Sequence, residues 1–277
     1  MISDTHLHTR LSSDGAQYEQ NSVFGYAKQA ENRNIKYIAI TEHRDIRTGA
    51  VGLINADLEE CQRQVKLTQR ILKEERSTTE VLCGVELGHG HTHSCEASDI
   101  LSANEYDFVL GSIHLLKDGF DFYSEDYKRY SDQQMRAFFA KYLEELYILA
   151  DTADFDSLAH CTYPLRYYAR SGRLLDLCNN PAKYAPEYVD IFKKLIKRGK
   201  ALEINTSGVK KSELTLPSPD LLKLYRDLGG KYVTTGSDSH DKIYVGSGID
   251  VAEDMLKELG FEGVTVFIKR KPIVIKL

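Results

Sequence analysis

The sequence predicts an α/β fold built around a parallel sheet. Short apolar runs recur along the 277 residues, and segments with helical periodicity separate most of them. Short continuous apolar runs are typical of parallel strands that are covered on both faces. Alternation of such strands with helices indicates repeated βα units, which build an open or a closed parallel sheet. The seven expected strands span 1–5, 37–41, 81–85, 108–113, 155–159, 201–204 and 232–235.

The segments between these runs carry the periodicity and the boundary residues of helices. Ser131 and Gln134 have the spacing of a capping box, and the helix that they open has an apolar face. That face consists of Met135, Phe138, Phe139, Tyr142, Leu143, Leu146 and Leu149. Gly199 ends a later helix, and Pro219 begins another. The other expected helices are one with Phe24, Ala27 and Ala30 on its apolar stripe, 53–76, 187–198 and 252–259.

Two further segments complete the chain. Residues 164–186 combine prolines, asparagines and paired tyrosines, and we expect them to form a long loop. Two short strands, 264–268 and 273–275, follow the last helix and are separated by a Lys-Arg-Lys-Pro turn. No linker, low-complexity tract or repeat divides the sequence, so we expect a single domain over 1–277.

Composition excludes several classes of protein. The formal net charge of −5 gives no basic footprint of the kind that nucleic-acid binders show, so we expect no nucleic-acid partner. No apolar run is long enough to cross a bilayer, and polar Ser3, Asp4 and His6 occupy the place of a signal peptide's apolar segment. Five irregularly spaced cysteines fit reduced thiols. The sequence therefore predicts a soluble cytoplasmic enzyme without a membrane partner, and leaves its oligomeric state open.

A candidate metal site begins at the first strand, in Asp4-Thr5-His6-Leu7-His8. Residues two apart on an extended strand point to the same face, so His6 and His8 can bind one ion. Two imidazoles in this arrangement suit zinc, manganese or iron, and Asp14 offers an oxygen ligand shortly afterwards. A strand that merely carries two hydrogen-bonded histidines is the alternative interpretation.

Residues of the same kind follow the other predicted strands. They are His43 after the second strand, Glu86 after the third, His114 after the fourth, His160 after the fifth, Glu203 and Asn205 at the sixth, and Asp238 and His240 after the seventh. In parallel α/β folds these strand ends lie on one rim, where active sites form. Any one of these histidines could be structural, but their common position favours a shared site. Because one ion is satisfied by three or four ligands, so many indicate a multinuclear metal centre.

The order of these motifs resembles the PHP (polymerase and histidinol phosphatase) family. The series is Asp-x-His-x-His, Thr-Glu-His, Gly-x-Glu, Ser-x-His, a lone His and Ser-Asp-x-His, and it extends from the first residues to His240. The resemblance implies one metallophosphoesterase domain over 1–277, folded as a distorted (β/α)7 barrel with three divalent ions at the C-terminal ends of the strands. It also implies the ligand sets: His6, His8, Glu86 and Asp238; Glu86, His114 and His160; Asp14, His43 and His240.

A narrower likeness points to the histidinol-phosphate phosphatase branch of this family. It rests on Leu202-Glu203-Ile204-Asn205-Thr206-Ser207-Gly208, on Lys210-Lys211 and Pro217-Ser218, and on Gly84-Val85-Glu86-Leu87-Gly88. The likeness implies hydrolysis of L-histidinol phosphate to L-histidinol and phosphate in histidine biosynthesis. Two alternatives stay open: a PHP phosphoesterase for a nucleotide, an oligonucleotide end or phosphotyrosine, and a non-catalytic PHP scaffold module.

A metal centre that hydrolyses phosphate esters also needs residues that bind the substrate and transfer protons. Metal-bound water is acidic enough to supply hydroxide near neutral pH, and a cation helps to neutralise the phosphate. We expect Arg166 to be that catalytic cation, Arg10 and Lys210 to join it in substrate binding, and His240 to protonate the leaving alkoxide as well as bind metal. Asp4 and Glu42 are expected to accept the outer N–H groups of ligand histidines. The sequence does not distinguish zinc, iron and manganese.

Three other groups of residues lie outside the predicted ligand set. We expect His89, His91 and His93 to lie in a flexible polar loop on the rim, and Tyr163, Tyr167 and Tyr168 either to line a pocket or to pack the loop. A substrate amine would need a carboxylate. The candidates after His114 are Asp118, Asp121, Glu125 and Asp126.

Overall fold

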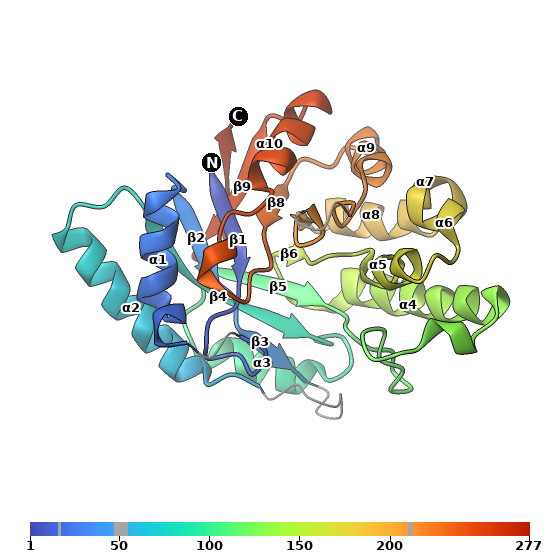
Figure 1. Cartoon of the computed structure of the whole chain (residues 1–277), viewed down its shortest axis with the longest axis horizontal. Helices are drawn as coiled ribbons and strands as arrows, with labels where there is room; N and C mark the ends of the chain where they lie inside the picture. Colours follow the sequence, from blue (N-terminus) through green and yellow to red (C-terminus); the bar gives the residue numbers. More distant parts are fainter. Residues whose placement is uncertain (16–17, 47–54, 210–212) are drawn as a thin grey trace.

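The fold is a nearly closed parallel barrel with helices on its outside. It is seen in a computed structural model that describes residues 1–15, 18–46, 55–209 and 213–277 (Figure 1). The strands, in spatial order, are β1 (Ser3–Leu7), β2 (Tyr37–Ile40), β4 (Glu80–Gly88), β5 (Phe108–Ser112), β6 (Ser157–Leu158), β7 (Ala201–Asn205) and β8 (Val233–Gly236). Short β3 (His43–Asp45) extends the sheet beside the second half of β4. All these pairs are parallel, which confirms the predicted α/β barrel and its seven strands.

The first and last strands of the barrel are held together mostly by side chains. Thr5 Oγ1 donates to the carbonyl oxygen of Thr235 at 3.0 Å, and Ser3 Oγ lies 3.1 Å from Thr235 Oγ1. Beyond the strand ends, the His8 amide donates to the carbonyl oxygen of Ser239 at 2.9 Å. This seam brings the ligand candidates that follow β1 next to those that follow β8.

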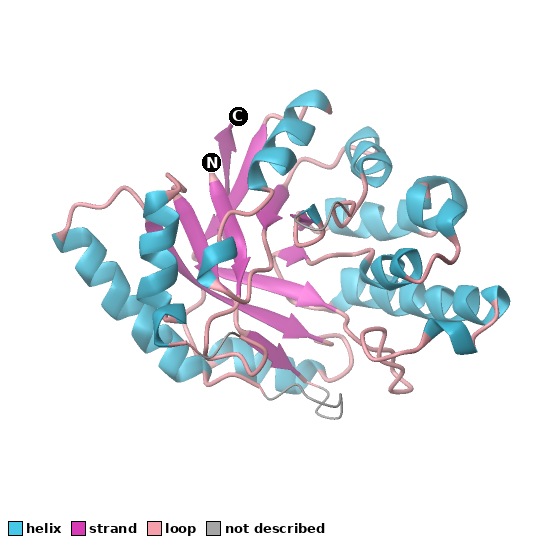
Figure 2. Ribbon diagram, viewed as in Figure 1, coloured by secondary structure: helices cyan, strands magenta, loops and turns pink. Residues whose placement is uncertain are grey.

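Helices cover the outside of the barrel, as Figure 2 shows. They are α1 (Val23–Asn32), α2 (Leu58–Glu74), α3 (Ser94–Ser102), α4 (Asp132–Thr152), α5 (Tyr163–Arg170), α6 (Leu175–Asn179), α7 (Pro181–Tyr184), α8 (Tyr188–Lys197), α9 (Pro219–Asp227) and α10 (Ile249–Glu258). Single 3-10 turns occur at η1 (Glu19–Asn21), η2 (Tyr127–Arg129) and η4 (Lys242–Tyr244). Within the described ranges, none of the helices has the length and apolar character needed to cross a membrane.

The predicted helix signals are mostly confirmed. The capping box of Ser131 and Gln134 opens α4, and six of the seven residues on its predicted apolar face are buried, with Phe138 only partly so. Gly199, at a φ of +66°, follows α8, and Pro219 begins α9. The helix predicted over 53–76 begins later, because Asp57 caps α2 by accepting from the Glu60 amide.

Two expectations from the sequence are wrong. The apolar stripe of α1 consists of Val23, Tyr26, Ala27 and Ala30, so Phe24 lies off the buried face and is 37% exposed. Residues 164–186 form α5, α6 and α7 rather than a loop. Their prolines were misleading because Pro164 and Pro181 lie in the first turns of helices, where proline needs no hydrogen-bond partner.

A C-terminal hairpin closes the end of the barrel opposite the candidate site. β9 (Gly263–Ile268) and β10 (Lys271–Lys276) are antiparallel, and their turn has positive φ at Lys269 and Arg270. Phe267 of β9 stacks on Phe108 at a ring-centroid distance of 5.5 Å, within a small apolar cluster that includes the first residues of several strands. Because this end is packed with apolar side chains, the C-terminal ends of the strands are left for polar chemistry.

Candidate metal centre

The nine predicted metal ligands come together at the C-terminal ends of the strands. His6 lies on β1, Glu86 on β4 and His43 at the start of β3, while the other six lie in the segments that follow β1, β5, β6 and β8. Four overlapping groups of three donors have ligand atoms within 4.8 Å of one another. They are His8–His43–His240, His6–His8–Asp238, His6–Glu86–His160 and His43–Glu86–His114.

Glu86 lies at the centre of the cluster and is 1% exposed. Its Oε1 lies 3.0 Å from His114 Nε2 and 2.9 Å from His160 Nε2. Its Oε2 lies 2.8 Å from His43 Nδ1, 3.3 Å from His6 Nε2 and 3.5 Å from His8 Nε2. One carboxylate therefore faces five imidazoles, as a ligand shared between two ions would.

Asp238 and Asp14 complete two further donor groups. Asp238 Oδ1 lies 3.6 Å from His6 Nε2 and 3.4 Å from His8 Nε2. Asp14 Oδ2 lies 3.3 Å from His43 Nε2 and 3.0 Å from His240 Nε2. These contacts join residues from opposite ends of the chain and place Asp14 beside His43 and His240.

Some ring nitrogens of the buried ligand histidines lack the hydrogen bonds that a purely structural role would require. Both ring nitrogens of His8, Nδ1 of His43 and Nδ1 of His160 are buried without a hydrogen bond of acceptable geometry. A buried polar group without a partner costs about 1–3 kcal/mol. Burial, with His43 and His240 nearby, lowers the pKa of His8 to about 3, so this ring is neutral and can donate a lone pair. These donors fit divalent cations.

The electrostatics of the cluster also favour positive charge. Burial opposes ionisation of Glu86, yet His114, His43 and His6 hold the pKa of this carboxyl well below its usual range. Burial likewise disfavours a proton on His43, but Glu86 and Asp14 raise the pKa of this ring to about 10. The carboxylates thus favour positive charge on the rings around them, and bound cations would supply positive charge at the same place.

Comparisons with known proteins decide the family. The PHP domain model matches residues 4–207, which cover most of the cluster. This chain belongs to the PHP family. A probable histidinol-phosphatase from Clostridium acetobutylicum is 31% identical over 95% of this chain and 97% of its own length. A histidinol-phosphatase from Lactococcus lactis is 26% identical over 95% of this chain and 93% of its own.

Solved structures share the fold of this PHP chain. The histidinol phosphate phosphatase of Lactococcus lactis, complexed with zinc, L-histidinol and phosphate, superposes with a TM-score of 0.76 at 22% identity and covers 98% of both chains. A putative histidinol phosphatase from Listeria monocytogenes has a TM-score of 0.74 at 19% identity, over 90% of this chain and 99% of its own. The predicted family is therefore confirmed, and the barrel has the architecture of these phosphatases.

Two buried carboxylates of the PHP domain have roles that differ from the prediction. Asp4 accepts from the amide and hydroxyl of Ser237 and from the Gly246 amide, at 2.8, 2.6 and 2.6 Å. Glu42 accepts from Thr9 and from Ser12 Oγ. Neither accepts from a ligand histidine. Each instead holds a loop: Asp4 holds the one with Asp238 and His240, and Glu42 holds the one that leads to Asp14.

The carboxylates that do contact ligand histidines are Glu203 and Asp45. Glu203 Oε1 lies 2.6 Å from His6 Nδ1, and Asp45 Oδ1 lies 3.2 Å from His114 Nδ1. Sequence reasoning placed Glu203 at a strand end but gave it no role. The available signal was its spacing of two from Asn205, which puts both side chains on the inner face of β7.

The three predicted substrate-binding cations have different surroundings. Arg166 lies on α5 and donates to Ser207 Oγ, which donates to Asn205 Oδ1 at 2.5 Å, and Asn205 Nδ2 donates to Asp238 Oδ2 at 3.2 Å. Arg166 is thus connected to the cluster by a short chain of hydrogen bonds. Arg10 is exposed on the loop between β1 and η1, and Lys210 lies outside the described residues.

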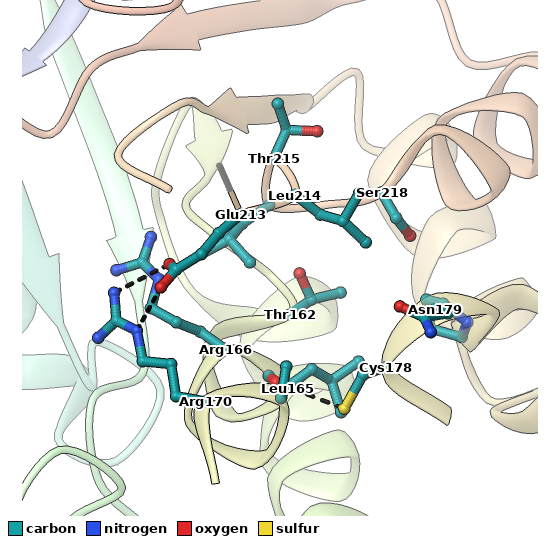
Figure 3. Close-up of a pocket in the computed structure, with 13 residues that line it drawn as sticks. Thr162, Leu165, Arg166, Arg170, Cys178, Asn179, Glu213, Leu214, Thr215 and Ser218 are labelled. Atoms are coloured by element: carbon teal, nitrogen blue, oxygen red, sulfur yellow. Dashed lines mark hydrogen bonds and ion pairs between the residues drawn. The ribbon is translucent and has the colours of Figure 1, made fainter. Parts of the chain in front are cut away.

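A pocket of about 300 Å³ lies beside Arg166, between α5, α6 and residues 213–218. Figure 3 shows Arg166 and Arg170 at one side of the pocket, near Glu213, with Leu165 and Leu214 among its apolar lining residues. Arg170 forms a two-pronged ion pair with Glu213, at 2.7 and 2.9 Å. Among the residues described, Arg166 has no carboxylate within 4.0 Å, so its charge is available to an anion.

Residues 89–93 form a loop between β4 and α3, as predicted, but not all of its histidines are exposed. His89 is fully buried with Nε2 3.9 Å from Asp45 Oδ1, and the His91 side chain faces Glu145 at 3.5 Å. Only His93 of the three is exposed. In the described part of the chain, no three metal-type donors that include His89 or His91 lie within 4.8 Å of one another.

The tyrosines and the acidic loop also have defined positions. Tyr163 lies against the rings of His114 and His160, with centroids 5.6 and 5.3 Å away, whereas buried Tyr168 donates to the carbonyl oxygen of Met135. The four acidic residues after His114 all have partners outside the cluster. Asp118 pairs with Lys141, Asp121 accepts from the Tyr123 amide, Glu125 accepts from Tyr130 and Asp126 accepts from the Lys128 amide.

Proposed function

We propose that this chain is a metal-dependent phosphomonoesterase that hydrolyses L-histidinol phosphate to L-histidinol and phosphate. The observation that carries the proposal is the convergence of nine ligand-type side chains on one end of the barrel. The substrate is supported by curated relatives named histidinol-phosphatase or probable histidinol-phosphatase, which align over nearly the whole chain. An intact ligand set favours this enzyme over a non-catalytic scaffold module.

The donor set suits three divalent ions, with zinc, iron or manganese as candidates. His6, His8, Glu86 and Asp238 would hold the first, and Glu86 would share the second with His114 and His160. Asp14, His43 and His240 would hold the third. When bound, such ions polarise a phosphate ester and make water acidic enough to supply a nucleophile near neutral pH.

Side chains around the cluster would orient and neutralise the substrate. Arg166 is the cation best placed to hold a phosphoryl oxygen, because its charge is unpaired by carboxylates among the described residues and it is linked to Asp238 through Ser207 and Asn205. Arg10 and Lys210 stay secondary candidates. The proton donor to the leaving alkoxide stays a prediction for His240, whose side chain is 32% exposed and thus accessible.

The organic part of the substrate would occupy the pocket beside Arg166. The pocket combines apolar Leu165, Leu214 and Leu216 with the polar groups of Thr215 and Asn179, which suits an imidazole ring that carries two nitrogens. The net charge of −5 fits a small phosphate ester better than a nucleic acid as the substrate. We also propose that the reaction takes place in the cytoplasm.

The direct test is phosphate release by the metal-replete protein. We expect a strong preference for L-histidinol phosphate over nucleoside monophosphates, phosphotyrosine and p-nitrophenyl phosphate, since only the first offers an unfused imidazole ring to the pocket. Chelated enzyme and His8→Ala are the controls, and both should lose the activity. The measured quantity is kcat/KM for each substrate.

The other possible outcomes of this assay distinguish the alternative functions. Comparable slow release from every ester would retain the metallophosphoesterase and reject the histidinol phosphate assignment. A preference for a nucleotide or for phosphotyrosine would identify one of the alternative substrates. No metal-dependent release from any ester would support the scaffold module instead.

Arg166 gives a prediction for catalysis. Replacing it with methionine keeps much of the side chain's bulk but removes the cation, so we expect kcat/KM to fall by roughly 10²–10³-fold for every phosphate ester. Arg170→Met is the matched control, because Arg170 lines the same pocket but is paired with Glu213. A smaller loss in Arg166→Met than in Arg170→Met would show that the guanidinium of Arg166 does not hold the phosphate.

A further inference from the structure

We propose that Glu203 is a positioning residue that sets the orientation of two metal ligands, His6 and His160, at the same time. The inference rests on the proposed function, because it concerns how ions are held at the same cluster. Glu203 is not one of the nine ligands. Its importance follows from where its two oxygens point.

The first oxygen of Glu203 determines which nitrogen of His6 carries the proton. Oε1 lies 2.6 Å from His6 Nδ1, and both side chains are essentially buried. A carboxylate oxygen only accepts, so the proton must be on Nδ1. When His6 binds an ion as a neutral ring, its lone pair is then on Nε2, which faces Glu86 and Asp238 at 3.3 and 3.6 Å. Carboxylate contacts of this kind fix the tautomer and ring orientation of metal-binding histidines.

The second oxygen of Glu203 holds the backbone of His160. Oε2 accepts from the His160 amide at 2.7 Å and from Asn205 Nδ2 at 3.4 Å. His160 has a φ of +24°, which is unfavourable for a residue with a side chain and needs support from its surroundings. In this conformation His160 Nε2 reaches Glu86 Oε1 at 2.9 Å. Glu203 therefore places one imidazole against each oxygen of Glu86.

The neighbouring strand leaves space for this arrangement. Gly236 of β8 lies beside His6 and Glu203, and a Cβ at this position would lie 2.3 Å from His6 Cβ and 2.7 Å from Glu203 Oε1. Any side chain here would displace the pair. Among the residues described, no lysine or arginine lies within 4.0 Å of the Glu203 carboxylate, so its partners are His6, His160 and Asn205.

Glutamine at this position cannot satisfy both partners. It offers one acceptor oxygen and one NH₂ donor in place of two acceptors. If the NH₂ group faces His6, the proton of that ring must move to Nε2, the nitrogen needed for the ion. If the NH₂ group faces His160, it opposes the amide N–H and weakens the turn. Aspartate keeps the charge but is one methylene too short to reach both donors.

The test compares Glu203→Gln and Glu203→Asp with wild type by zinc and manganese titration, metal content and steady-state kinetics. We expect metal affinity to fall about 10- to 100-fold in each variant, as for other residues that orient metal ligands. Activity at limiting metal should fall with it, and excess metal should restore part of kcat with KM nearly unchanged. A residue that only stabilised the fold would not produce this rescue by metal.

A matched control is Asp156→Asn. Asp156 is also a buried carboxylate that accepts a backbone amide, from Val109 at 2.9 Å, but it pairs with Arg270 at the hairpin end of the barrel. This variant should lose stability without losing metal affinity. Equal metal affinity in wild type and in the folded Glu203 variants would overturn the inference, whereas a wild-type protein without bound metal or activity would overturn the proposed function itself.

An NMR measurement that begins with the wild-type protein tests the same inference. Nitrogen-15 NMR of histidine-labelled, zinc-loaded enzyme should show a buried imidazole protonated at Nδ1, with the downfield proton shift of a short hydrogen bond to carboxylate. The resonance of His6 should be lost in any Glu203→Gln protein that folds, whereas the similar resonance of His114 beside Asp45 should stay. Absence of the His6 resonance from the wild-type spectrum would also overturn the inference.

Discussion

Replacement of Glu86 by glutamine is expected to abolish metal-dependent phosphate release. The carboxylate lies against five imidazoles, and each of its oxygens faces a different set of them. Glutamine removes the negative charge and turns one of the two acceptors into a donor. Loss of one preorganised electrostatic group in an active site costs roughly 10²–10³-fold in rate. Glu86 would serve two ions, so we expect a loss above this range, measured as kcat/KM for L-histidinol phosphate.

The control for this variant is Glu145→Gln, which makes the same chemical change nearby. Glu145 faces His91 and accepts from the Lys117 amide, but it contacts none of the nine ligands among its described interactions. It should keep near wild-type activity and metal content. Metal analysis then gives the reason for any effect: Glu86→Gln should bind fewer ions per chain even when circular dichroism shows an intact fold. Activity that survives in Glu86→Gln would exclude the proposed sharing of this carboxylate.

Much of the barrel and its ligand set is predictable from sequence for a simple physical reason. Parallel strands put their C-terminal ends on one rim, so residues as distant as His6 and His240 could be grouped without knowledge of the fold. Strand periodicity and helix caps are local signals, and the Ser131 capping box of α4 is an example. The residues that determine a strand or a helix end are close together in the sequence, so these elements can be predicted without knowledge of the fold.

Side-chain partners across the barrel were not predictable in the same way. Asp4 and Glu42 neighbour the ligand histidines in sequence, yet their carboxylates turn away to hold loops, while distant Glu203 contacts His6. Which carboxylate faces which ring depends on how strands are placed around the barrel. The helices within 164–186 were missed for a different reason, because proline acts as a breaker inside a helix but is favoured in its first turn.

Removal of metal is expected to lower thermal stability as well as activity. Ligands that bind only the folded protein stabilise it by RT ln(1 + [L]/Kd), about 2.7 kcal/mol for one ion at 100 times its Kd. For a protein of 277 residues, that energy corresponds to a shift in Tm of roughly 5 °C for each such ion. The effect should be large here because the cluster buries imidazole nitrogens, such as both of His8, that lack hydrogen-bond partners without an ion.

Calorimetry in the presence of chelator, zinc or manganese measures this shift, and Glu86→Gln separates its causes. If the ions stabilise the fold through the buried cluster, zinc should raise the Tm of wild type much more than that of the variant. Glu145→Gln should respond to zinc as wild type does. An equal rise in all three proteins would mean that zinc binds elsewhere, for example at exposed His93. No rise in wild type would contradict the metal centre, because the cluster would then bind no zinc.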